Sequence, residues 1–148
     1  MRRRRFVRIR SLSIREWLLL AQLVVVSLAI HVALLAAPVE RVAAALGRGA
    51  ASERLRRFPF LSESLASGRL TTIVDLATLL TSGRHRCLPR SLLLLWLMRT
   101  RGEPVVLRIG AAKGSGGELE GHAWVEIGGR PVVDSPSHTS RFSPFLRF

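Results

Sequence analysis

The stretch 87–134 constrains the fold most, because its hydrophobic pattern changes from that of a helix to that of a β-hairpin. Residues 92–98 form an apolar run after a proline, a residue that fits the first turn of a helix. Residues 104–109 then predict a buried strand, and residues 122–127 alternate as a second strand. A glycine pair predicts a tight turn into a returning strand at 131–134. The pattern predicts an α+β fold in which helices pack on a small antiparallel sheet.

Cys87, the only cysteine of the chain, stands at the expected start of this helix. The partial positive charge at a helix N-terminus stabilises a thiolate and lowers the pKa of the thiol. The free N–H groups of the first turn are also available to stabilise an oxyanion. A lone cysteine is more often a small buried hydrophobic residue. The helix-start position and the His and Asp residues downstream nevertheless favour a nucleophile.

The second strand carries His122, and the returning strand ends at Asp134. Neighbouring strands bring the carboxylate within reach of the imidazole, and the alternation places His122, Trp124 and Glu126 on one face. A thiol nucleophile needs a base to take its proton and a third group to orient that base. We therefore predict a catalytic triad in which Cys87 is the nucleophile, His122 the general base and acid, and Asp134 the orienting carboxylate.

A metal site is the alternative use of this cysteine, since His85, His122 and His138 could join Cys87 in a zinc site. The paired spacing of zinc ligands is absent, however, and His138 stands in a polar tail with no evident partner. We therefore expect neither a metal nor a cofactor. Trp124 is expected to form a wall of the site or part of the core.

Several motifs of this region resemble the transglutaminase-like leader peptidases of lasso-peptide biosynthesis, the protease part of the lasso B protein. They are Cys-Leu-Pro-Arg-Ser-Leu at 87–92, Arg-Gly at 101–102, Ile-Gly at 109–110, His-Ala-Trp-Val-Glu at 122–126, and Asp134. The resemblance implies a papain-like fold and a cysteine peptidase that removes the leader from a ribosomally made precursor peptide. It gives Cys87, His122 and Asp134 the same three roles.

The resemblance also implies partners. In lasso systems a small domain of strands and a winged helical part binds the leader, either fused to the peptidase or made as a separate chain. Residues 1–80 are apolar and helical in pattern and show no alternating strands. We therefore expect the split form, with the precursor leader as substrate and a separate leader-recognition protein. The macrolactam synthetase is a further candidate partner.

Residues 17–37 contain no charged residue, and as a helix they would extend about 30 Å, enough to span a bilayer. Gln22, Ser27 and His31 oppose insertion, because a lipid-facing helix must hide its polar groups. The same helix can pack against the catalytic domain or a partner protein. Membrane contact through residues 17–37 therefore stays open beside a cytoplasmic location.

By composition the chain divides into a basic arm (1–15), a helical apolar region (16–69) and a catalytic domain (70–148). Residues 70–80 predict a further helix, which would pack beside the cysteine helix. The net charge of +13 suits nucleic acid, an anionic membrane or an acidic partner. The chain has no zinc-finger spacing and no aromatic-rich RNA-binding motif, so we expect no nucleic-acid partner.

A function of another class stays open, namely a non-catalytic scaffold or membrane-associated interaction protein that keeps the fold without the chemistry. An activated Cys87 reacts fast with alkylating agents and has an apparent pKa well below about 8.5, whereas a buried structural thiol resists until the protein unfolds. Acyl transfer to an amine instead of water would use the same three residues. Only analysis of the products separates that reaction from hydrolysis.

Overall fold

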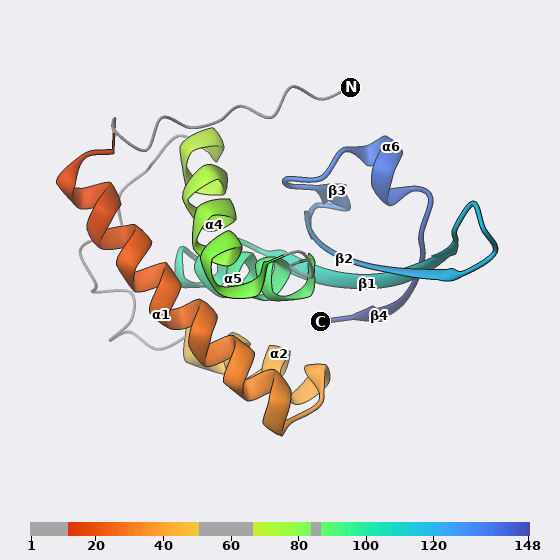
Figure 1. The fold of residues 1–148 in the computed structure, drawn as a ribbon, viewed down its shortest axis with the longest axis horizontal. Coiled ribbons are helices and arrows are strands. Elements are labelled where there is room, and N and C mark those ends of the chain that lie inside the picture. Colours follow the sequence, from red (N-terminus) through yellow and green to blue (C-terminus); the bar gives the residue numbers. More distant parts are fainter. Residues whose placement is uncertain (1–11, 51–66, 84–86) are drawn as a thin grey trace.

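The structure, a computed structural model, describes residues 12–50, 67–83 and 87–148. Its elements in chain order are α1 (Ile14–Ala36), α2 (Val39–Ala50), α4 (Ser67–Ser82), α5 (Cys87–Thr100), β1 (Val105–Lys113), β2 (Leu119–Ile127), β3 (Arg130–Pro131), α6 (Pro136–Thr139) and β4 (Ser143–Arg147). Helix α5 lies between the other long helices and the sheet (Figure 1). The expected α+β architecture is confirmed. His85 and most of the basic arm lie outside the described residues.

Helix α5 forms the centre of the core. All residues from Ser91 to Met98 are buried, because α1, α2 and α4 surround the helix on one side and β1 and β2 cover the other. The predicted helix at 70–80 is present as α4. Gly102 has a φ of 79°, and the N–H of Glu103 donates to the carbonyl of Met98 at 3.0 Å. The glycine therefore ends α5 in a left-handed conformation that a side chain would disfavour.

The sheet has four strands in the order β3-β2-β1-β4, and each neighbouring pair is antiparallel. Strands β1 and β2 form a long hairpin in which Gly110 lies opposite His122. Gly128 and Gly129 both have positive φ and form the turn after β2, as predicted. The C-terminal residues return as β4 beside β1, so this apolar end packs on the domain.

The returning strand is shorter than predicted. Strand β3 contains only Arg130 and Pro131, and pairing ends where the N–H of Val132 donates to the carbonyl of Val125 at 3.0 Å. Proline has no N–H to donate and is therefore found at strand edges and ends. Asp134 consequently lies in the bend between β3 and α6, and the prediction that it ends a strand is wrong.

Helix α1 turns Ser27 and His31 toward α4. The Ser27 hydroxyl lies 2.7 Å from that of Thr81, and the Ser82 hydroxyl lies 3.4 Å from Nδ1 of His31. Leu19, Leu23 and other residues of the same side are buried in the shared core. Of the described helices, α1 alone is long and apolar enough to cross a membrane by length and composition.

Candidate active site

Cys87 is the first residue of α5, as predicted, and its side chain is half-buried. Its interaction with the imidazole of His122 is the main cause that lowers the pKa of the thiol below its ordinary value. Burial opposes this effect, while backbone hydrogen bonds at Ala123 and Leu88 reinforce it. The positive end of the α5 dipole acts in the same direction. The thiol therefore ionises more readily than a free cysteine.

His122 lies in β2, next to the Cys87 thiol and also next to Asp134. Its Nε2 atom is 3.8 Å from Oδ2 of Asp134, an ion-pair contact that is longer than a hydrogen bond. Nε2 is buried and has no hydrogen-bond partner among the described residues. Asp134, the larger cause, and Cys87 together raise the pKa of His122 to about 9, although burial acts in the opposite direction. At neutral pH the imidazole is therefore positively charged beside a readily ionised thiol.

Asp134 lies between two cations. Burial disfavours its charged form, but His122, Arg90 and His138 outweigh burial and lower the pKa of the carboxyl. Nη1 of Arg90 is 3.5 Å from Oδ1, whereas the other oxygen faces His122. Arg90 also pairs through Nε with Asp75 of α4. The carboxylate therefore stays ionised, as a group that orients an imidazolium must.

A cluster of rings surrounds His122. The indole of Trp124 stacks on the imidazole with ring centres 5.9 Å apart and planes 13° apart. The ring of Phe142 is 5.0 Å away, and His138 contacts the imidazole edge-on at 4.8 Å. Both Trp124 and Phe142 are buried. Trp124 therefore forms a wall of the site, and the packed rings restrict rotation of the imidazole.

The indole of Trp124 is itself held in place. Its Nε1 donates to Oε1 of Glu126 at 2.8 Å, and Nε of Arg108 donates to the other oxygen of that carboxylate at 3.2 Å. His122, Trp124 and Glu126 thus share one face of β2, as the alternation predicts. These contacts fix the plane of the indole against the imidazole.

A buried hydrogen bond joins α5 to β2 beside the site. The hydroxyl of Ser91, one turn after Cys87, donates to the carbonyl of Ala123 at 2.8 Å. Ala123 directly follows His122 in β2. The bond therefore holds the thiol-bearing end of the helix against the strand that carries the imidazole.

The structure brings together all three residues predicted for the triad, but three of their neighbours were missed. Arg90 follows Cys87 by three residues, a spacing that puts both side chains on one side of a helix, so the sequence carried a signal for it. His138 was predicted to have no partner, and this is wrong because the bend after β3 brings it against His122. The same bend brings Phe142 against His122, and no local pattern in the sequence indicates the contact of His138 or of Phe142 with that ring.

The described part of the chain contains no group of three or more His, Cys, Asp or Glu side chains placed to hold a metal ion. His85, one of the residues considered for zinc, lies outside it. The chemistry available among the described residues is that of a thiolate, an imidazolium and a carboxylate in contact. Such a set can form a covalent acyl intermediate and move a proton.

Residues 23–147 match the family model of the transglutaminase-like superfamily. The matched range includes α5, all four strands and the positions of Cys87, His122 and Asp134. No curated protein and no solved structure matches the chain. Because the matched residues make up most of the sequence, the chain belongs to the transglutaminase-like superfamily.

Proposed function

We propose that the protein is a cysteine peptidase that removes the leader from a ribosomally made lasso precursor peptide. The observation that carries the proposal is the order of groups, in which the imidazole of His122 contacts both the thiol of Cys87 and the carboxylate of Asp134. Membership of a superfamily that includes cysteine peptidases supports the reaction class. The resemblance at 87–92 and 122–126 supports the leader as the substrate.

In the proposed reaction the Cys87 thiolate attacks the carbonyl carbon at the junction of leader and core. N–H groups in the first turn of α5 stabilise the resulting oxyanion. Protonated His122 gives its proton to the leaving nitrogen as the peptide bond breaks, and this nitrogen becomes the N-terminus of the core. The leader remains on Cys87 as a thioester. His122 then takes a proton from water, which hydrolyses the thioester and restores the thiolate and the imidazolium.

The orientation of His122 supports this division of roles. Because Nε2 faces Asp134, Nδ1 is the ring nitrogen left to exchange a proton at the sulfur. Asp134 and the ring of Trp124 hold the imidazole in that orientation. A separate leader-recognition protein, which we propose as a partner, would bring the precursor to Cys87.

Mass spectrometry of the precursor peptide encoded beside this chain tests the proposal. The peptide is incubated with the protein, with and without a candidate leader-binding protein. We expect one cut, made faster by the binding protein and absent with Cys87→Ala. Ser137, an exposed residue of α6 that precedes His138, offers a control, and Ser137→Ala is expected to cut like the wild type. Cutting by the Cys87→Ala protein would overturn the assignment of the nucleophile.

The scaffold interpretation predicts a different set of results. A protein that only scaffolds leaves the precursor intact under all conditions, and its Cys87 reacts with iodoacetamide no faster than a free cysteine. A product in which the leader is joined to an added amine, instead of ending in a carboxylate, would indicate amine transfer by the same thioester. The mass of the released leader distinguishes these products.

A further inference from the structure

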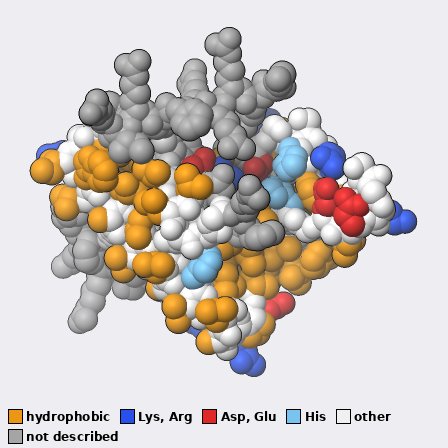
Figure 2. Space-filling model, viewed as in Figure 1, with side chains coloured by type: hydrophobic (Ala, Val, Ile, Leu, Met, Phe, Trp, Pro, Cys, Tyr) orange, Lys and Arg blue, Asp and Glu red, His pale blue; other side chains and the backbone are white. Residues whose placement is uncertain are grey.

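Helix α1 presents a long apolar face to the surface. Six of its large side chains, which we name the outer stripe, are between 46% and 88% exposed: Ile14, Leu18, Val25, Leu28, Val32 and Leu35. With Ala21 between the second and third, they recur at alternating intervals of four and three, so they lie along one side of the helix. Figure 2 shows apolar side chains over the part of the surface that α1 occupies in Figure 1. A soluble protein rarely leaves so continuous an apolar strip in water.

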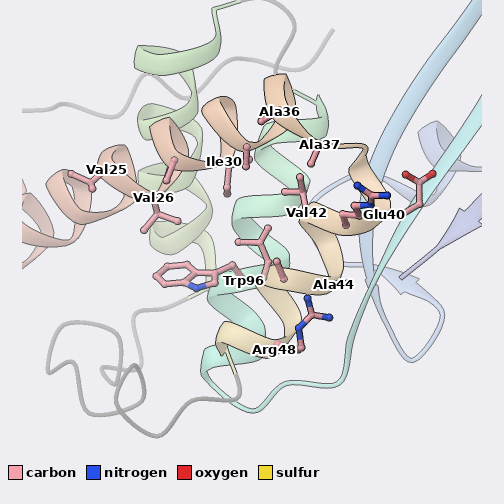
Figure 3. A pocket seen from close by; sticks show the side chains of 15 residues that line it. Val25, Val26, Ile30, Ala36, Ala37, Glu40, Val42, Ala44, Arg48 and Trp96 are labelled. Atoms are coloured by element: carbon pink, nitrogen blue, oxygen red, sulfur yellow. The ribbon is translucent and has the colours of Figure 1, made fainter.

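The apolar surface continues into a groove between α1 and α2. The groove has a volume of about 960 Å³, and Val25 of the outer stripe, together with Trp96 of α5, contributes to its walls (Figure 3). Arg41 and Arg48 of α2 lie at this groove and are exposed, as is Glu40. The apolar face of α1 is therefore bordered at its C-terminal end by two arginines and one glutamate.

We infer that the outer stripe rests on the surface of an anionic lipid bilayer, with α1 lying parallel to the membrane plane. Charge complementarity supports this occupant. No acidic residue stands between Glu16 and Glu40, while the arginine-rich arm (1–15) leads into α1 and Arg41 and Arg48 follow it. The net charge of the chain is +13. An interfacial helix of this kind combines a buried apolar face with arginines that attract anionic headgroups.

The composition of α1 favours lipid over a second protein helix. Paired helices with an apolar seam usually carry charged residues beside the seam, which set the register and the partner. Residues 17–37 contain no charged residue, so α1 beyond its first turn offers no charge to specify such a pairing. Trp17, which is 47% exposed, stands near the N-terminal end of the stripe. Tryptophan is favoured at the level of the lipid headgroups.

The inner side of α1 argues against a transmembrane span. Leu19, Leu23 and Ile30 are almost fully buried in the core, and the buried Ser27 hydroxyl bonds to that of Thr81. Spanning a bilayer would pull these groups away from α4 and α5. A helix that lies flat on the membrane keeps every one of these contacts and inserts only its outer stripe.

The same geometry leaves the Cys87 site accessible. Helix α5 separates α1 from the sheet, and the N-terminal end of α5, which carries Cys87, points toward β2 and away from α1 (Figure 1). Membrane contact through the outer stripe is therefore compatible with access of a peptide to the thiol.

Flotation with lipid vesicles tests the inference on the full chain. The wild-type protein is mixed with vesicles of phosphatidylcholine alone or with a large share of phosphatidylglycerol. A stripe variant carries Leu28→Ser, Val32→Ser and Leu35→Ser, all at exposed positions. A control variant carries Leu119→Ser and Phe145→Ser, which remove exposed apolar side chains from the sheet. Circular dichroism and thermal unfolding establish that each variant is folded.

We expect the wild type and the control variant to float with the anionic vesicles and the stripe variant to lose at least about tenfold in partitioning, since three apolar side chains no longer enter lipid. Binding should weaken with added salt and on neutral vesicles. The inference is overturned if the stripe variant floats to the same extent as the wild type, or if the wild type does not float with anionic vesicles. It is also overturned if light scattering shows a wild-type dimer that the stripe variant abolishes while neither protein floats. Resistance of membrane-bound protein to extraction with alkaline carbonate would establish a spanning helix instead.

Discussion

Nη1 of Arg90 lies 3.5 Å from Oδ1 of Asp134, while the other oxygen of that carboxylate faces His122. Arg90 stands three residues after Cys87 on the same helix. The helix that presents the thiol therefore also presents a cation that keeps the orienting carboxylate ionised. Loss of that cation would allow the pKa of Asp134 to rise and would weaken its hold on His122.

We predict that Arg90→Gln lowers kcat/KM for leader removal by about tenfold. This is the factor that corresponds to a weakening of the Asp134–His122 interaction by about one pKa unit. Steady-state cleavage of the precursor measures the change. Asp75→Asn is the matched control, because it removes the second ion pair of Arg90 and leaves the cation beside Asp134. We expect this control to retain most of the activity. Equal losses in both variants would indicate that Arg90 acts only by joining α4 to α5.

The pH dependence of cleavage should differ from that of alkylation. Alkylation needs only the thiolate, so its rate should rise with pH at values below the ordinary pKa of a thiol and then stay constant. Cleavage also needs protonated His122 to supply the leaving nitrogen with a proton. Since the pKa of His122 is raised to about 9, cleavage should fall as pH increases through about 9. Because the Cys87 thiol and the His122 imidazole shift each other's pKa, the two pKa values that these profiles give describe the pair and not either group alone.

Asp134→Asn should move the alkaline limb of cleavage to lower pH. The carboxylate is the main cause of the raised pKa of His122, so its removal brings that pKa down. The rate at the optimum should fall by up to about four orders of magnitude if the ring loses its orientation. Full pH profiles of the variant and the wild type provide the measurement. If the activity of the variant falls at the same alkaline pH as that of the wild type, a group other than His122 causes that fall.

Local patterns in the sequence were sufficient to place the thiol and the imidazole. A proline after Cys87 indicated a helix start, and strict alternation placed His122 and Trp124 on one face of a strand. Both features depend on residues within a few positions of each other, where chain geometry decides the outcome. The same holds for the turn at 128–129, which needs two residues with positive φ.

Contacts between distant segments could not be inferred in this way. His138 reaches His122 only because Pro131 ends β3 early and the chain bends into α6. Residues 17–37 carry no charge and only a few polar residues, so composition alone did not reveal which side is buried. The structure distinguishes the sides, because Ser27 and His31 face α4 while Val32 faces the surface.

The start of α1 should depend on Glu16. Its carboxylate accepts from the N–H of Ser13 at 2.8 Å in a capping box and also pairs with Arg69 of α4 at 2.7 Å. The Ser13 backbone bond is the main cause that lowers the pKa of Glu16. We predict that Glu16→Gln destabilises the protein by about 1 kcal/mol at pH 7, because glutamine keeps the capping box but loses the negative charge that pairs with Arg69 and favours the helix N-terminus.

The destabilisation by Glu16→Gln should disappear in acid. A carboxyl whose pKa is lowered in the folded protein contributes stability above its unfolded pKa and loses it as pH falls through the folded value. Thermal unfolding of the wild type and the variant should therefore differ at pH 7 and converge below about pH 4. A difference that does not begin to shrink as pH falls below about 4 would mean that the variant acts through side-chain shape instead of charge.

Two glycines in the central hairpin allow a test of the packing behind His122. Gly110 lies opposite His122, and a Cβ added there would come within 2.9 Å of the Ser143 carbonyl and 3.0 Å of the Trp124 ring. At Gly121, in the facing strand, an added Cβ would meet nothing within 4 Å. We predict that Gly110→Ala destabilises the protein by about 1 to 3 kcal/mol, the usual cost of overpacking. Gly121→Ala should be neutral or stabilise by up to about 1 kcal/mol, because alanine restricts the unfolded chain more than glycine does.

Urea denaturation of both glycine variants measures these changes, and cleavage of the precursor adds a second readout. Because the Trp124 ring stacks on His122, a displaced indole in Gly110→Ala should also slow cleavage, whereas Gly121→Ala should cut normally. Equal stability of the two variants would contradict the close approach of β4 and Trp124 to Gly110. Reduced stability of Gly110→Ala with normal cleavage would mean that strand β4 moves away from the added methyl group while Trp124 keeps its place against the imidazole.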